Sequence, residues 1–265
     1  MIDQSTIEAL KQMHLSAMAI EFERQLADHN TYSKLGFEER LGLMVDAEYS
    51  RRQANKLQRY IKSAHFSAPG AAIEGIEYYE DRKLDKAQLL RLATCSYIDE
   101  GHHIILKGAS GNGKTFISNA LGNAACRKFK SVRYIRMPEL LDELNVAKGC
   151  GALKKTIAAY RKVDLLILDE WLIRRLSPQE SYDLLEIVEA RTDRGSIIFC
   201  TQYEPAEWYS RITPDTNESS PITEAIMDRI IHNSYELMID GRISMRERNG
   251  LKSILKDGYG EGCAR

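Results

Sequence analysis

The sequence has almost no net charge. Its 265 residues carry 37 Lys and Arg against 38 Asp and Glu, a balance of −1 at pH 7, so overall charge does not attract nucleic acid. Five cysteines are present, but none forms a C-x-x-C pair or has metal-ligand spacing, which favours reduced thiols in a cytoplasm. No stretch approaches transmembrane length, and the N-terminus lacks the continuous apolar block of a signal peptide. We therefore expect a cytoplasmic protein without a membrane partner.

One segment carries the full pattern of a phosphate-binding loop. Residues 108–115 are Gly-Ala-Ser-Gly-Asn-Gly-Lys-Thr and follow an apolar run at 104–106 that is typical of a strand. The glycines let backbone N–H groups approach phosphates, and the next helix presents its positive end there. We expect Lys114 to place its charge on the outer phosphates and Thr115 to give its hydroxyl to Mg²⁺. The expected nucleotide-binding residues are Gly108, Ala109, Ser110, Gly111, Asn112, Gly113, Lys114, Thr115 and Phe116.

A second apolar run ends in two carboxylates. Residues 165–168 are followed by Asp169 and Glu170, about the distance downstream at which such ATPases place their acidic residues. Asp169 is expected to hold the same magnesium ion as Thr115, through water. Glu170 is then available to polarise the attacking water; the alternative is a solvated acid at the end of a strand. Together the two motifs predict an ATPase with ATP and Mg²⁺ as cofactors.

Strands and helices alternate from about residue 85 onward. Strands are expected at 102–107, 131–136, 165–170, 196–202 and 235–240. Helices are expected at 85–98, 115–128, from 138, and at 152–162, 178–194 and 222–232, the one at 178 beginning with a capping box. His102 and His103 are assigned to the start of the first strand rather than to a metal site. The alternation predicts an α/β fold whose parallel sheet is flanked by helices.

The chain is expected to divide near residue 70. A length of 265 residues can hold one nucleotide-binding domain and a smaller companion, and an apolar content of 43% gives an ample core. The expected parts are an all-helical N-terminal domain at 1–70, a surface linker at 71–84, the ATPase domain at 85–256 and a disordered tail at 257–265.

Two long helices are expected in the N-terminal domain. The first begins at a Ser5–Glu8 capping box and runs to about residue 27 with an interruption near 14–16. A turn at 30–36 separates it from the second, at about 37–64. The second helix carries an apolar face that we expect to be core: Phe37, Leu41, Met44, Val45, Leu57, Tyr60, Ile61 and Ala64.

Basic residues gather in two places. Arg52, Lys56 and Arg59 fall at i, i+4 and i+7 on one helical face, where they can follow a phosphate backbone. An ordinary solvated face near the helix C-terminus is an equal alternative. The second place is the Gly-flanked lysines after the second strand, for which an ordinary exposed loop is an equal alternative. Any binding is expected to be salt-sensitive and tolerant of sequence. The candidate DNA-contact residues are Arg51, Arg52, Lys56, Arg59, Lys62, Lys148, Lys154 and Lys155.

The order of the motifs resembles the AAA+ ATPases. The phosphate loop, Asp169-Glu170, Thr201-Gln202 and the helical stretch Ala225–Ile230 follow that family's order, particularly in the branch with DnaC-type helicase loaders. The pattern Phe37–Leu41, Asp46–Tyr49, Arg51-Arg52 and Leu84–Ala87 is similar to the IstB-type transposition helper ATPases of bacterial insertion sequences. The resemblance covers nearly the whole chain.

The resemblance implies roles for further residues. Lys114 and Glu170 would be catalytic, and Gln202 would be the sensor of the γ-phosphate, with Thr201 as the alternative because Asn is more usual there. Arg229 would be an arginine finger that reaches a neighbouring subunit's nucleotide, the alternative being a surface arginine paired with an acid. Too few residues follow the last strand for a full lid, so a truncated C-terminal lid is expected, with Arg246 as second sensor.

The resemblance also implies partners. The protein would assemble with ATP on duplex DNA as a homo-oligomer with shared active sites and would recruit or activate a transposase. A helicase loader that contacts a replicative helicase and single-stranded DNA is the first alternative, and a nucleotide switch without DNA is the second. The basic N-terminal helix favours the transposition helper.

Overall fold

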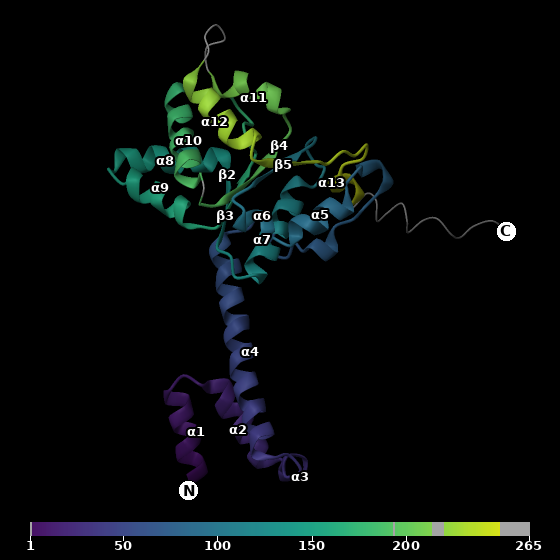
Figure 1. Ribbon diagram of the computed structural model, residues 1–265, viewed down its shortest axis with the longest axis vertical. Helices are drawn as coiled ribbons and strands as arrows, with labels where there is room; N and C mark the ends of the chain where they lie inside the picture. Colours follow the sequence, from purple (N-terminus) through teal and green to yellow (C-terminus); the bar gives the residue numbers. More distant parts are fainter. Residues whose placement is uncertain (1, 193, 214–219, 250–265) are drawn as a thin grey trace, which may run out of the picture. The chain divides into compact units, whose positions relative to one another are not determined.

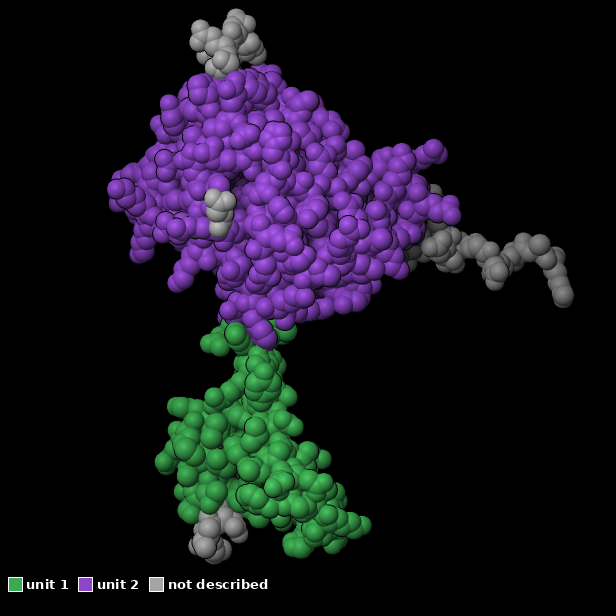
Figure 2. Space-filling view, in the orientation of Figure 1, with its two compact units in different colours: residues 1–59 green, residues 60–265 purple. Residues whose placement is uncertain are grey.

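The computed structural model describes residues 2–192, 194–213 and 220–249. Contacts divide the chain into two compact units, residues 1–59 (unit 1) and 60–265 (unit 2), which Figure 2 shows in different colours. The tail expected at 257–265 and the last residues of the expected ATPase domain lie outside the described residues.

Unit 1 is helical, as predicted. It contains α1 (Ile2–Gln12), α2 (Ser16–Ala27), α3 (His29–Tyr32) and all but the last residues of α4 (Phe37–Ala64). The break between α1 and α2 and the bounds of α4 confirm the predicted helices. The predicted capping box at Ser5 is wrong, because α1 has already begun at Ile2 and Ser5 lies inside it. The expected turn at 30–36 is partly helical, since α3 extends to Tyr32.

The carboxylate of Glu48 on α4 bonds to the start of α2. One oxygen accepts the backbone N–H groups of Ala17 at 2.9 Å and Met18 at 3.3 Å, at the start of α2. The other accepts Nε of Arg52 at 2.8 Å. A buried carboxylate therefore satisfies helix N–H groups that have no partner within α2 and fixes α2 on α4.

The apolar face predicted on α4 is only partly covered. Ala64 is fully buried, but Phe37, Leu41 and Val45 are 78%, 36% and 49% exposed. The prediction that these three residues belong to a core is wrong, because the described residues of unit 1 leave them exposed to solvent. The buried hydrophobic side chains among the described residues of unit 1 are Ile7, Ala19 and Tyr32.

Unit 2 is built on the predicted parallel sheet. Its strands are β1 (His103–Lys107), β2 (Val132–Arg136), β3 (Leu165–Asp169), β4 (Ser196–Thr201) and β5 (Ser234–Met238). They lie in the order β2-β3-β4-β1-β5, and every neighbouring pair is parallel. Every residue of β3 and β4 is buried, as expected of apolar strands that are covered on both faces.

Helices flank the sheet (Figure 1). They are α5 (Lys86–Ala93), α6 (Ser96–Asp99), α7 (Lys114–Arg127), α8 (Met137–Gly149), α9 (Leu153–Lys162), α10 (Pro178–Arg191), α11 (Pro205–Ile212), α12 (Pro221–Ile231) and α13 (Met245–Arg248). The single helix expected at 85–98 is broken, because Cys95 adopts a left-handed φ of 64° between α5 and α6. In the part of the chain that the structure describes, no helix is long and apolar enough to cross a membrane.

The segment that follows α4 packs on unit 2 instead of running over its surface. It contains the short 3-10 helices η1 (Ile73–Gly75) and η2 (Glu80–Arg82). On α7, the side-chain amide of Asn123 donates to the carbonyls of Pro69 at 3.0 Å and Ala71 at 2.6 Å. Residues 60–70 belong to unit 2, so the division falls before the boundary expected at residue 70.

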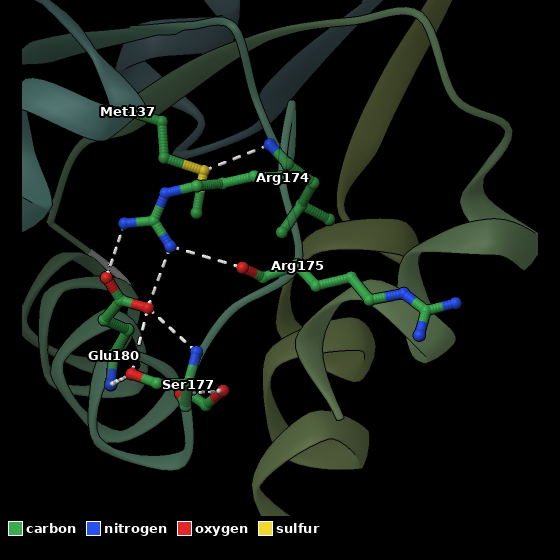
Figure 3. A network of polar contacts seen from close by, with 7 residues as sticks. Met137, Arg174, Arg175, Ser177 and Glu180 are labelled. Carbon is green, nitrogen blue, oxygen red and sulfur yellow. Dashed lines mark hydrogen bonds and ion pairs between the residues drawn. The ribbon is translucent and has the colours of Figure 1, made fainter. Parts of the chain in front are cut away.

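The start of α10 shows the predicted capping box (Figure 3). Ser177 Oγ accepts the backbone N–H of Glu180 at 3.3 Å, and the Glu180 carboxylate accepts the Ser177 N–H at 2.8 Å. Nη1 and Nη2 of Arg174 also donate to Glu180, whereas the side chain of Arg175 points away from this network. The Arg174 guanidinium lowers the pKa of Glu180 from 4.5 to about 2.

Candidate nucleotide-binding site

The predicted phosphate loop connects β1 to α7. Gly111 and Gly113 have φ values of 86° and 85°, in the left-handed region that favours glycine. A Cβ on Gly108 would lie 2.0 Å from the carbonyl oxygen of Ile239, and one on Gly111 would lie 2.8 Å from Cβ of Ser244. The loop therefore needs glycine both for its conformation and for the close approach of the chain beyond β5.

Lys114 lies at the first position of α7 with its side chain over the loop. Its Nζ donates to the carbonyls of Gly108 at 2.7 Å and Ala109 at 2.8 Å. Burial lowers the pKa of Lys114, with a contribution from the positive charge of Arg246. This half-buried ammonium donates to carbonyls and has no carboxylate in contact, which favours binding of an anion.

Thr115 and Asp169, which are both predicted to hold the magnesium ion, contact each other directly. The Thr115 hydroxyl donates to Asp169 Oδ2 at 2.7 Å, and the Tyr134 hydroxyl donates to the same oxygen at 2.8 Å. Asp169 Oδ1 accepts the backbone N–H of Glu170 at 2.9 Å. A hydroxyl and a carboxylate in contact at the foot of the phosphate loop are the oxygen ligands that Mg²⁺ takes, so these residues fit the predicted ion.

Glu170 is held by an arginine that the sequence does not single out. Nη2 of Arg136 donates to both Glu170 oxygens, at 2.8 and 2.7 Å. Arg136 ends β2 and is the register partner of Asp169 on β3, so the parallel pairing of these strands is the signal that identifies it. Glu170 itself adopts a left-handed φ of 56°, a conformation that non-glycine residues take mainly where structure constrains them.

A cavity of about 690 Å³ lies over these groups and gathers most of the predicted nucleotide-binding residues. Its lining includes Ser110, Gly111, Gly113, Lys114, Thr115, Phe116, Asp169, Glu170, Gln202 and Arg246. Gly108, Ala109 and Asn112 do not line it. Asn112 is buried and its side-chain amide donates to the Ile239 carbonyl at 3.0 Å, so it supports the loop from outside the cavity.

The two sensor candidates at the end of β4 differ in environment. Thr201 is buried, and its hydroxyl donates to the Trp171 carbonyl at 3.2 Å and accepts the Tyr203 N–H at 3.1 Å. Gln202 is exposed and its amide donates to the Tyr203 hydroxyl at 2.9 Å. Both residues line the cavity, but only Gln202 has a polar group available to a ligand there.

The two predicted arginines lie in different places. Arg246, on α13, lines the cavity. Arg229, on α12, does not line it, and its Nη2 donates to Glu189 on α10 at 2.9 Å. One subunit therefore does not bring Arg229 to its own nucleotide cavity.

The segment before α5 forms one wall of the cavity, which the sequence prediction missed when it placed a surface linker there. Ala68, Gly75, Ile76 and Arg82 line the cavity. Arg82 is buried, and its Nη2 donates to the Asn112 carbonyl of the phosphate loop at 2.8 Å. Ala71 and Ile76 are both buried, and their apolar character is a signal in the sequence that this segment packs against other residues.

The candidate DNA-contact residues are in several environments. Arg51 and Arg52 face Glu48, at 3.9 and 2.8 Å, and Lys148 pairs with Asp183 on α10. Arg59, Lys62, Lys154 and Lys155 are exposed, and Lys56 is half-buried. The three paired residues have structural partners within the chain, which leaves the exposed four as the stronger candidates.

The paired histidines lie at the start of β1 and directly before it. Within the described ranges, no three His, Cys, Asp or Glu side chains gather into a group that could hold a metal ion. His103 is buried in β1, where its Nδ1 accepts the backbone N–H of Ile197 at 3.2 Å, and burial lowers its pKa from 6.5 to about 4. Its place in the first strand confirms the prediction.

Comparison with solved structures supports the fold. The chain superposes on AMPPCP-bound DnaA from Aquifex aeolicus with a TM-score of 0.54 and 18% identity, over 71% of this chain and 55% of that one. It superposes on the DnaC helicase loader with a TM-score of 0.52 and 18% identity, over 64% of this chain and 97% of that one. The α/β core is therefore that of the P-loop AAA+ proteins.

Sequence comparison identifies the family. The family model for IstB-like ATP binding proteins matches residues 8–253. A protein of Pseudomonas fluorescens, named as the ATP-binding protein of insertion sequence IS1162, is 37% identical over 76% of this chain and 87% of its own. An insertion sequence ATP-binding protein of Sinorhizobium fredii is 34% identical over 96% of this chain and 100% of its own. The chain belongs to the family of IstB-like ATP binding proteins.

Proposed function

We propose that this protein is a magnesium-dependent ATPase that assembles with ATP on duplex DNA and recruits or activates a transposase. The observation that carries the proposal is the cavity in which Lys114, the Thr115–Asp169 pair and Glu170 surround the foot of the phosphate loop. ATP, magnesium and DNA occur together in the cytoplasm, which is the proposed location.

The cavity supports each step of ATP hydrolysis. Lys114 and the loop N–H groups would bind the phosphates, and Thr115 and Asp169 would hold Mg²⁺, which supplies charge neutralisation at the phosphates when bound. Glu170 would orient and polarise water beside the terminal phosphate, and Gln202 would hydrogen-bond to that water or phosphate. Arg246 would add a second cation to the phosphate site.

The DNA and transposase parts of the proposal rest on the relatives and on exposed charge. The relatives named above are encoded by insertion sequences, elements whose movement requires a transposase. Among the proteins of similar fold, the replication initiator DnaA has also been solved bound to AMPPCP and single-stranded DNA. In this chain Arg59, Lys62, Lys154 and Lys155 are exposed, as phosphate contacts require.

Self-assembly is supported by two features. The exposed face of α4 presents Phe37, Leu41, Val45 and Tyr49 at steps of four residues, and their exposed fractions range from 36% to 78%. A row of large apolar side chains in water favours a protein partner. Arg229 lies outside its own subunit's cavity, where an arginine finger for a neighbouring subunit has to be.

A helicase loader is the second candidate function. The DnaC helicase loader is covered over 97% of its chain by this fold, so the core alone does not separate the two functions. They differ in the nucleic acid: the transposition helper binds duplex DNA, and the loader contacts single strands and a helicase.

Binding of fluorescent duplex and single-stranded DNA, with ATP, with ADP and without nucleotide, tests the proposal when particle mass is followed in parallel. We expect ATP-dependent growth into large complexes on duplex DNA, and loss of both binding and growth in Lys114→Ala. Preference for single strands would instead support helicase loading. DNA binding that is the same with ATP, with ADP and without nucleotide would contradict ATP-dependent assembly for both candidate functions.

A further inference from the structure

Two segments far apart in sequence meet at the phosphate loop. From the C-terminal side, Met245 N–H donates to the Gly111 carbonyl at 2.9 Å. From the N-terminal side, Arg82 of η2 donates to the Asn112 carbonyl at 2.8 Å. The backbone N–H of Asp240 in turn donates to the Arg82 carbonyl at 3.1 Å, so the two segments also bond to each other.

An ion pair joins the same segments outside the nucleotide cavity. Nη2 of Arg248 lies 2.6 Å from both carboxylate oxygens of Asp81, and its guanidinium lies 4.1 Å from the centroid of the Tyr79 ring. Asp81 also accepts the Arg242 N–H at 3.2 Å. The two charged side chains are only 18% and 24% exposed, so solvent screens this pair less than a surface pair.

Asp81 is ionised in this setting. Burial by itself would raise its pKa, but the Arg248 guanidinium and backbone N–H groups outweigh burial and bring the pKa below its usual value. The attraction to Arg248 is therefore present at neutral pH.

The ion pair anchors the helix that carries Arg246. Arg246 and Arg248 are two residues apart on α13, a spacing that points side chains to different sides of a helix. Arg248 faces Asp81, and Arg246 lines the nucleotide cavity, where its charge contributes to the lowered pKa of Lys114. α13 is only one turn long, so its own hydrogen bonds cannot fix its direction.

We propose that Asp81 and Arg248 are positioning residues, whose ion pair holds α13 against the phosphate loop so that Arg246 faces the phosphates of bound ATP. The inference rests on the proposed function, because it takes ATP as the ligand of the cavity. Loss of the pair lets α13 move and withdraws one positive charge from the phosphates. ATP carries more negative charge than ADP, so its affinity depends more strongly on that cation.

The ATP and ADP affinities of the full-length protein test the proposal. They are measured by competition of ATP or ADP against a fluorescent nucleotide analogue. For Asp81→Asn and Arg248→Gln we expect ATP to bind roughly tenfold more weakly and ADP to change by less than about threefold. The matched control is Lys83→Gln. It breaks the Lys83–Asp240 pair at 3.3 Å, which joins the same segments but is 75% and 52% exposed, and it is expected to leave both affinities within about twofold.

A double variant shows whether Asp81 acts through Arg246. Asp81→Asn combined with Arg246→Ala is expected to bind ATP no more weakly than Arg246→Ala alone, because the ion pair has nothing left to position. Additive losses, equal losses of ATP and ADP, or unchanged ATP affinity in Asp81→Asn would each overturn the proposal.

Two further measurements are needed: the folding of each variant and the ATP affinity of the wild-type protein. Thermal melts check that each variant is folded; if Asp81→Asn is not, Arg248→Lys, which keeps the charge but not the two-oxygen contact, is expected to show an intermediate loss of ATP affinity. If Arg248→Lys and Arg248→Gln each bind ATP as tightly as the wild type does, the proposed role of the Asp81–Arg248 ion pair is wrong. A wild-type protein that binds no ATP would overturn the proposed function, whereas a wild type that binds ATP beside an unaffected Asp81→Asn overturns the positioning pair alone.

Discussion

At the scale of single residues, the two adjacent acids of the site have different partners. Asp169 is buried and accepts hydrogen bonds from the hydroxyls of Thr115 and Tyr134. Burial raises the pKa of Tyr134, so its hydroxyl stays protonated and remains a donor. Glu170 is partly exposed and faces a permanent cation, Arg136. The environments suit Asp169 for holding a metal ion and Glu170 for a movable role near water.

Replacing Glu170 with Gln is expected to leave ATP binding intact and to slow hydrolysis by roughly a hundredfold or more, because an amide cannot take a proton from water. Steady-state phosphate release and nucleotide titration measure the two effects separately. The variant should also retain ATP-dependent complexes on DNA for longer than the wild type. Turnover close to that of the wild type would remove Glu170 as the group that activates water.

Replacing Arg136 with Gln is expected to raise ATP turnover by roughly two- to tenfold, since Glu170 loses the cation that holds it away from water. Arg133→Gln is the matched control: it lies on the same strand but pairs with Glu143 at 3.6 Å and does not contact Glu170. Phosphate release at saturating ATP measures the effect. A fall in turnover for Arg136→Gln would show that the pair assists hydrolysis rather than restraining it.

At the scale of elements, the loops of the site end where the helices α7 and α10 begin. α7 begins at Lys114, directly after left-handed Gly113, so its positive end faces the cavity. α10 begins at a capping box that closes the turn after Glu170, and Arg174 from that turn reaches back to Glu180 (Figure 3). The capping box thus fixes the C-terminal end of the segment that begins with Glu170.

Replacing Glu180 with Gln is expected to lower the free energy of unfolding by about 1 kcal/mol at pH 7, since Arg174 is half-exposed and solvent weakens the pair. The folded pKa of about 2 lies below the ordinary value of 4.5, so this stability is present above pH 4.5 and is lost as the pH falls toward 2. Denaturant unfolding at several pH values measures the difference between wild type and variant.

The control for Glu180 is Glu186→Gln, which removes the same charge from an exposed position of α10. It should cost less than about 0.5 kcal/mol and show no such pH dependence. A difference between wild type and Glu180→Gln that stays constant from pH 7 down to pH 3 would contradict the assigned cause.

At the scale of the whole molecule, one chain does not bring every proposed site residue to its own cavity. Its cavity contains the phosphate loop, both acids and Arg246, but Arg229 is absent from the lining and is held by Glu189. The exposed apolar row on α4 likewise lacks a cover within the described residues of unit 1. Both features favour a working form with several subunits.

Mixing two inactive variants tests the shared site. Arg229→Ala is expected to bind ATP normally and to lose at least about a hundredfold in turnover, and Lys114→Ala to lose ATP binding. In a mixed assembly, Arg229 of a Lys114→Ala subunit can reach the intact phosphate loop of an Arg229→Ala subunit. The rate of phosphate release by the mixture should therefore exceed the sum of the rates of the two variants measured separately. Glu189→Gln, which frees Arg229 without removing it, serves as control and should keep near-normal turnover. A mixture that releases phosphate no faster than the two variants do separately would contradict the proposal that Arg229 acts on the nucleotide of a neighbouring subunit.

Patterns within a few residues determined much of this protein from its sequence. The phosphate loop, the apolar run before Asp169 and the capping box at Ser177 depend on local spacing, and the structure has all three. Alternating strands and helices likewise specified the parallel sheet, because that connection is the ordinary way to pair parallel strands. Family membership follows from the same motifs and is confirmed by comparison.

Only the tertiary structure decided which distant residues meet. Arg136 reaches Glu170 through strand register, Arg82 reaches the phosphate loop through packing of residues 60–82, and Arg248 reaches Asp81 across most of the chain. The exposure of Phe37 was also undetermined, because an apolar helical face specifies that something should cover it but not whether the chain supplies the cover. Local sequence sets conformation and periodicity, whereas these contacts depend on packing between segments that no short pattern encodes.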